Sequence, residues 1–252
     1  MCTLAIYFRV FPGYPVVVAA NRDEYLARPA TAPELLNDDP IVIGGKDLKA
    51  GGTWLGVNQY GLVAGLLNRR ASGSIDPARR SRGLLCLEAL RYRAAGDALR
   101  FVTAQNGAAY NSFNLLIASR DEAFVAYNRR DEVETSRMEP GVHLLTNLDV
   151  DDFECPKISH AYDRFAALAG DPEFCANPID RRDLLSALLA DHATQLDSRS
   201  SAPNAICVHL DGYGTRSSSL IFIDDHGAVQ HFFAAGSPCT ARYQPAPTPS
   251  AR

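Results

Sequence analysis

The sequence predicts an α+β fold in which antiparallel β-sheet packs with helices on its faces. Strand-like segments form an early and a late block, helical segments lie between them, and few β-α-β alternations occur. This order argues against a doubly wound parallel sheet. The sequence contains no Gly-x-Gly-x-x-Gly after a strand, no Walker A loop and no Gly-x-Ser-x-Gly elbow. A nucleotide-binding loop and a serine-hydrolase elbow are therefore not indicated.

The first predicted element is a hairpin. Apolar residues run over 3–7 and again over 16–20, and residues 11–15 form a turn rich in Pro and Gly. The first strand begins at Cys2, and the second ends in the polar residues 21–24, Asn-Arg-Asp-Glu. Because the two ends of a hairpin meet, we expect Cys2 and this polar segment to share one site.

A second hairpin follows an irregular stretch. Turn signals fill residues 28–40, and strands are predicted at 53–57 and 62–67, the second ending at Asn68. The only tryptophan, Trp54, is either a core residue or a platform for substrate. The loops at 28–47 and 69–82 are expected to shape the pocket. The second loop holds Arg69 among several arginines, which fit a carboxylate or phosphate or simply a solvated loop.

The remaining segments alternate in type. Helices are predicted at 82–95, 97–106, 157–169 and 180–190. Strands are predicted at 113–119, 123–127, 142–146, 205–210, 217–223 and 229–233. We expect residues 1–240 to form a single domain and residues 241–252, rich in Pro and Ala, to form a disordered tail.

Composition narrows the class of protein. The chain has 252 residues, of which 46% are hydrophobic and 21% charged, so a sizeable core is possible. A net charge of -4 gives no general attraction to nucleic acid or anionic membranes. No signal-like start and no apolar run of ~18 residues occurs, so no membrane span is predicted. We expect a cytoplasmic location, with organelle import left open. The sequence does not indicate an oligomeric state.

The cysteines and histidines are scattered. The chain has 6 of each and no Cys-x-x-Cys pair, so we interpret the cysteines as reduced thiols. Cys207-Val208-His209 and the segment 226–231, with its two histidines, contain possible metal ligands, but neither is a recognisable zinc pattern. The sequence therefore predicts no metal site, and no organic cofactor is required.

The chemistry expected at Cys2 depends on removal of Met1. Cys is small enough for the initiator Met to be cleaved, which would leave an α-amine beside the thiol. The amine has an ordinary pKa of roughly 7.7–8.0 and the thiol one of about 8.5, so the amine can serve as base for its own nucleophile. Such a site also needs a carboxylate or amide to orient the amine, donors for an oxyanion, and a cation.

Several motifs together resemble one family. They are Met1-Cys2-Thr3-Leu4, the segment 19–24, Gly51-Gly52-Thr53-Trp54-Leu55-Gly56-Val57, Leu67-Asn68-Arg69, Ser81-Arg82-Gly83, Phe113-Asn114-Leu115-Leu116, Leu145-Thr146-Asn147 and the segment 213–218. In this order they resemble the NRDE family, which includes transport-and-Golgi-organisation proteins. The resemblance covers residues 1–233. It implies the four-layer αββα sandwich of the N-terminal nucleophile hydrolases, nearest to the bile-salt hydrolase and penicillin V acylase group.

The resemblance also implies roles for individual residues. Cys2 is expected to be the nucleophile, Asp23 the carboxylate beside its amine, and Asn68 and Asn147 the oxyanion donors. Arg216 resembles an arginine that supports the nucleophile. On this interpretation the protein acts on a small amide or thioester. Turn caps for the two asparagines and an ion pair for Arg216 remain the alternatives.

One position departs from the acylase pattern. The acylases have an arginine three residues before their aspartate, where this chain has Ala20. Neighbouring residues of a strand face opposite sides, so Asn21 and Asp23 are expected on one face and Arg22 on the other. Either the strand bulges to bring Arg22 into the site or Arg22 is structural. Asn21 and Arg22 are accordingly candidates for substrate contacts only.

A non-catalytic carrier is the alternative function. Members of the NRDE family have been linked to movement of haem and to lipid handling, so the resemblance also implies a possible hydrophobic ligand. In this chain Cys155-Pro156, with His160 nearby, is the only feature that suggests a haem ligand. A scaffold that keeps the enzyme fold without the chemistry is a third interpretation.

Overall fold

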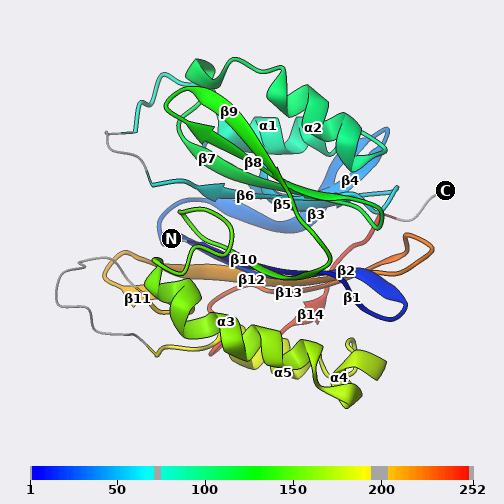
Figure 1. The fold of residues 1–252 in the computed structure, drawn as a ribbon. Coiled ribbons are helices and arrows are strands. Elements are labelled where there is room, and N and C mark those ends of the chain that lie inside the picture. The colour runs from blue at the N-terminus through cyan, green and yellow to red at the C-terminus, as the bar shows by residue number, and fades with distance from the viewer. Residues whose placement is uncertain (1, 71–74, 194–203, 250–252) are drawn as a thin grey trace.

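The computed structural model describes residues 2–70, 75–193 and 204–249. Its described strands form two antiparallel sheets that lie face to face (Figure 1). The first sheet contains, in spatial order, β10 (Gly141–Leu145), β1 (Thr3–Phe11), β2 (Tyr14–Tyr25), β12 (Tyr213–Ile223), β13 (Val229–Ala234) and β14 (Gln244–Pro245), and β11 (His209–Leu210) pairs with β12. The second contains β3 (Ala30–Asp38), β4 (Ile41–Asp47), β5 (Thr53–Asn58), β6 (Val63–Asn68), β7 (Phe113–Ala118), β8 (Ala123–Arg129) and β9 (Glu132–Arg137).

Helices cover the outer face of each sheet. On the second sheet lie α1 (Arg82–Ala89) and α2 (Ala95–Thr103), followed by the short η1 (Gly107–Ala109). On the first lie α3 (Pro156–Ala169), α4 (Pro172–Ala176) and α5 (Arg182–Leu189). The layers therefore run helix, sheet, sheet, helix, and the predicted αββα sandwich is confirmed.

Strands β1 and β2 are buried on both faces, which explains their nearly continuous apolar sequences. Along β1, Leu4 and Ile6 pack into the core between the sheets, while Ala5 and Tyr7 pack against the helices. Burying a Leu or Ile side chain contributes roughly 1.5–3 kcal/mol. The first hairpin therefore joins two of the three hydrophobic cores.

The structure corrects three sequence predictions. Residues 30–47 form strands β3 and β4 instead of an irregular loop. The predicted strand at 205–210 is reduced to β11. Part of the tail predicted to be disordered is ordered, because β14 pairs with β13 and Ala246 donates a hydrogen bond to the His231 carbonyl. Strands β3, β11 and β14 are polar or half-exposed, so their sequences lack the apolar run that marks a buried strand. Strand β4 is largely buried, and its apolar run is only three residues long before Gly44. Residues 250–252 lie outside the described residues.

None of the described helices could span a membrane. Each of them is too short or too polar to cross a bilayer.

Candidate active site around Cys2

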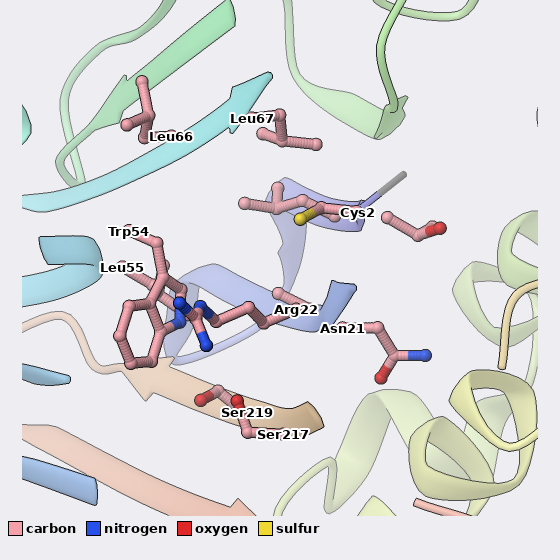
Figure 2. Close-up of a pocket in the computed structure, with 12 residues that line it drawn as sticks. Cys2, Asn21, Arg22, Trp54, Leu55, Leu66, Leu67, Ser217 and Ser219 are labelled. Carbon is pink, nitrogen blue, oxygen red and sulfur yellow. The ribbon is translucent and has the colours of Figure 1, made fainter. Parts of the chain in front are cut away.

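The end of the first hairpin borders a small pocket between the sheets. Thr3 pairs with Asn21, so the thiol of Cys2 lies beside the polar end of β2. The pocket is drawn in Figure 2, and its lining comes from the start of the chain, β2, β5, β6 and β12: Cys2, Thr3, Leu4, Ala20, Asn21, Arg22, Trp54, Leu55, Leu66, Leu67, Ser217 and Ser219. Its volume is about 20 Å³, close to the roughly 10–15 Å³ that one water molecule needs.

The thiol of Cys2 is held in a partly buried position. It packs against the core between the sheets and donates a weak hydrogen bond to the backbone carbonyl of Asp23, with Sγ 3.7 Å from the oxygen. Burial raises the pKa of this thiol, and the negative charge of Asp23 raises it further, while the positive charge of Arg22 opposes the rise. The neutral thiol is therefore the favoured form, and reaction at this sulfur needs a base. Met1 lies outside the described residues.

Arg22 reaches the pocket without any bulge in β2. It follows Ala20 by two positions, so both side chains face the space between the sheets, where they sit opposite Ser217 and Ser219 of β12. Its guanidinium stacks on the indole of Trp54, 4.1 Å from the ring centroid, and lies 3.8 Å from Asp47. Strand alternation alone therefore brings Arg22 into the pocket.

Trp54 has its place because Gly45 lies under its ring. A Cβ at Gly45 would come within 2.3 Å of the indole, so a larger residue there would displace the ring. The buried cation and ring attract each other by up to about 2 kcal/mol. Trp54 therefore lines the pocket and packs on the core at once, and its service as a platform for substrate stays a prediction.

Asp23 lies on the opposite face of β2, toward the helices. Its carboxylate accepts a hydrogen bond from Thr215 at 2.6 Å and pairs with Lys157 at 3.1 Å. Both charged side chains are fully buried, and the Lys157 ammonium also contacts Thr3 at 3.4 Å. Asp23 therefore meets Cys2 through its backbone carbonyl, and its carboxylate is fixed beneath the start of β1.

Asn21 and Arg216 have contacts other than those expected. The Asn21 side chain points away from Arg22 (Figure 2) and donates to the carbonyls of Leu189 and Ile206 at 2.8 and 3.0 Å, which ties the sheet to the helical layer. Arg216 is the extra residue of a bulge in β12, and its guanidinium donates to the Leu26 carbonyl. A bulge turns a side chain out of the regular alternation, so Arg216 does not line the Cys2 pocket.

The predicted oxyanion donors lie near the rim. Asn68 follows the pocket residues Leu66 and Leu67, but its side chain is exposed. Asn147 is buried just beyond β10, whose Leu145 pairs with Leu4, so it lies at the Cys2 end of the sheet. Their service as oxyanion donors stays a prediction.

Arg69 belongs to a separate polar cluster. It lies 2.6 Å from Asp149 and donates to Asn114 at 3.0 Å. It is not part of the pocket lining.

The residues considered for haem are engaged elsewhere. Cys155 is buried at the start of α3, 3.3 Å from the Thr146 hydroxyl. His160 faces Asp191 at 3.3 Å. A haem ligand at either residue would have to break these contacts.

Sequence reasoning missed several neighbours of the site. Lys157 lies 134 residues from Asp23 along the chain, and a lysine at a helix start carries no local mark of burial. Tyr213, whose hydroxyl donates to the Asp23 carbonyl at 3.2 Å, and Ser217 lie in the motif 213–218, so that motif was the available signal.

The sequence of the chain is similar to one family of known proteins. The family model described as Transport and Golgi organisation 2 matches residues 1–233. The chain belongs to the Transport and Golgi organisation 2 family. The human Transport and Golgi organization protein 2 homolog is 29% identical over 254 residues, with 91% of each chain covered. The NRDE motifs of the sequence are thus those of the Transport and Golgi organisation 2 family.

Solved structures share the fold of this chain. Penicillin V acylase from Agrobacterium tumefaciens has a TM-score of 0.59 at 14% identity, covering 96% of this chain and 84% of the acylase. The C2A mutant of conjugated bile acid hydrolase from Clostridium perfringens has a TM-score of 0.55 at 10% identity, covering 98% and 97%. At these identities the likeness concerns the fold alone.

We expect Arg22→Met to slow alkylation of Cys2 by iodoacetamide several-fold at pH 7. The guanidinium opposes the rise in the pKa of the thiol, so its removal leaves less thiolate. Alkylation rates measured by mass spectrometry between pH 6 and 10 should show the Cys2 profile moved to higher pH. Arg28→Met is the matched control, because Arg28 pairs with the same Asp47 at 2.8 Å and lies outside the pocket. Unchanged profiles in both variants would contradict the electrostatic role of Arg22.

Proposed function

We propose that the protein is a cysteine hydrolase of the N-terminal nucleophile type that acts on a small amide or thioester. The observation that carries the proposal is the position of Cys2, one residue before β1, with its thiol in the pocket beside Arg22 and Asp23. The solved C2A mutant of bile acid hydrolase has the same fold and a substitution at its own second residue.

The acid–base chemistry follows from the environment of the thiol. Burial keeps the Cys2 thiol protonated, so attack on a carbonyl requires a base within reach. Removal of Met1 would supply the α-amine of Cys2 as that base. The amine would take the thiol proton during attack and return it to the leaving group. Asp23, held by Lys157 and Thr215, would orient the amine.

The narrow pocket sets a condition on the substrate. A volume of about 20 Å³ does not hold an acyl chain. The stack of Arg22 on Trp54 must therefore open when substrate enters. An anionic or carbonyl oxygen would be drawn to the guanidinium, which then leaves the indole as an apolar wall. Asn68 and Asn147 would contribute to the oxyanion hole from the rim.

Two measurements test this proposal. Intact-mass analysis should show loss of Met1, because retention of Met1 leaves no free amine on Cys2. Probes with a β-lactone or acyl thioester should then label Cys2 at least tenfold faster than any other cysteine, and Cys2→Ser should abolish this labelling. Acyl amides and thioesters that compete with the probe would be screened as substrates.

The control is Cys175→Ser, which removes another partly exposed thiol that lies in α4 and outside the pocket lining. In Cys175→Ser, the rate at which the probe labels Cys2 should equal the rate in the unmodified protein. Retained Met1, or equal labelling of all cysteines, would overturn the nucleophile assignment. In that event a carrier of haem or lipid becomes the better hypothesis, and a saturable Soret shift on haem titration would identify it. A cytoplasmic location is part of the same proposal, to be checked by fractionation.

A further inference from the structure

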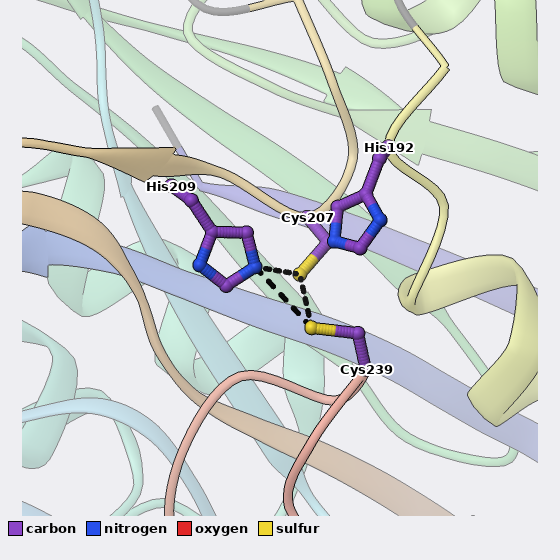
Figure 3. Close-up of side chains that lie close together, drawn as sticks. All are labelled: His192, Cys207, His209 and Cys239. Atoms are coloured by element: carbon purple, nitrogen blue, oxygen red, sulfur yellow. Dashed lines mark hydrogen bonds between the residues drawn. The ribbon is translucent and has the colours of Figure 1, made fainter.

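Four metal-binding side chains meet at the edge of the first sheet, on the helical side. His192 follows α5, Cys207 and His209 flank the start of β11, and Cys239 lies in the loop after β13. One nitrogen or sulfur of each lies within 4.8 Å of all the others. Figure 3 shows the side chains converging from these separate segments. We infer that these four residues form a structural zinc site with two cysteine and two histidine ligands.

The distances match a tetrahedral ion. With Zn–S bonds of about 2.3 Å and Zn–N bonds of about 2.0–2.1 Å, the edges of the tetrahedron are about 3.8 Å between two sulfurs and roughly 3.6 Å between sulfur and nitrogen. In the structure the Cys207 and Cys239 sulfurs lie 3.7 Å apart. The His209 Nε2 lies 3.5 Å from the first sulfur and 3.2 Å from the second. These three ligand atoms therefore already lie at tetrahedral spacing, and His192, whose ligand atom lies within 4.8 Å of them, would close in to complete the site.

The ligand set selects zinc over other metals. Two thiolates and two imidazoles are typical of tetrahedral Zn²⁺, whereas carboxylates and carbonyls suit Mg²⁺ and Ca²⁺. Two thiol protons leave when the ion binds, so two thiolates and two neutral imidazoles balance its charge. All four positions are filled by protein, which leaves none for substrate. A closed site of this kind stabilises a fold and does no chemistry.

The site would fasten three segments that are distant in sequence. Cys207 also donates its backbone N–H to the Asp191 carbonyl at 2.8 Å, beside His192. The next residue, Val208, donates to the Thr215 hydroxyl at 2.9 Å, and that hydroxyl donates to Asp23 at 2.6 Å. The zinc site is therefore two hydrogen bonds away from the carboxylate beneath Cys2. The inference does not depend on catalysis at Cys2.

Metal analysis of the full-length reduced protein tests the inference. After incubation with ZnCl2 and gel filtration, we expect one zinc per chain and a rise in Tm of roughly 5–10 °C over the EDTA-treated protein. Replacement by Co²⁺ should give the intense visible bands of a tetrahedral site with sulfur-to-cobalt charge transfer. Cys239→Ser and His209→Gln should each weaken zinc retention at least tenfold.

Two variants serve as controls. Cys175→Ser and His226→Gln remove a thiol and an imidazole outside the cluster, and both should keep one zinc per chain. The cobalt spectrum is measured on the unmodified chain, so this part of the test does not depend on whether the variants fold. Retention of less than a tenth of an equivalent by the unmodified protein would overturn the inference. So would a cobalt spectrum without sulfur charge transfer, or equal retention by Cys239→Ser.

Discussion

Replacing Lys157 with methionine should lower the free energy of unfolding by about 3–5 kcal/mol. The ammonium of Lys157 lies 3.1 Å from Asp23, and both side chains are completely buried. Without Lys157, a fully buried carboxylate loses its ammonium partner. An exposed ion pair contributes only about 0–1 kcal/mol, so the size of the loss reports burial. Urea denaturation followed by circular dichroism measures it.

A double variant separates charge from packing. In Lys157→Met with Asp23→Asn, the buried charge is removed together with its partner, and much of the lost stability should return. Lys46→Met, at an exposed position on β4, should change stability by less than about 0.5 kcal/mol. If the double variant is no more stable than Lys157→Met alone, the loss arises from packing.

Stability should also fall in mild acid because of His231. This imidazole is buried in β13 with its Nε2 3.3 Å from the Ser219 hydroxyl. Burial lowers its pKa from 6.5 to about 4. Below pH 6.5 His231 is protonated in the unfolded chain, whereas in the folded chain it stays neutral until about pH 4. The stabilisation is therefore complete above pH 6.5 and is lost as the pH falls to 4, by about 3 kcal/mol.

His231→Gln provides the test. Glutamine keeps a polar partner for Ser219 and does not titrate, so the slope of stability against pH between 6.5 and 4 should become shallower. His226→Gln, which removes an exposed histidine from the turn before β13, should leave that slope unchanged. Equal slopes in the parent and His231→Gln would mean that other groups cause the acid sensitivity. Urea midpoints at half-unit pH intervals give the comparison.

The parts that could be predicted from sequence are those with local signals. The apolar runs of β1 and β2 mark strands buried on both faces, and hairpin geometry alone brings Cys2 to residues 21–24. Strand β3 carries polar residues at a sheet edge and gives no such run. Alternation also predicted that Asn21 and Asp23 share one face of β2 and that Arg22 lies on the other. Only the structure shows which of the two faces borders the pocket.

Other features depend on contacts between distant segments. Lys157 meets Asp23 only because α3 packs under the first sheet. Arg216 points away from the pocket because of a bulge in β12, and no pattern in Tyr-Gly-Thr-Arg-Ser-Ser predicts that bulge. Likewise, His192 and Cys239 lie far from the Cys-x-His pair in the chain, so the spacing rules for zinc ligands could not find the cluster.

The double burial of β2 has a consequence for sequence length. Adjacent residues of this strand serve different layers: Arg22 stacks on Trp54 between the sheets, and Asp23 pairs with Lys157 under the helices. Insertion or deletion of one residue ahead of them would exchange their sides. The carboxylate would then enter the thiol pocket, and the guanidinium would face a buried ammonium. A one-residue change of register along β2 would therefore disrupt the contacts of both layers at once.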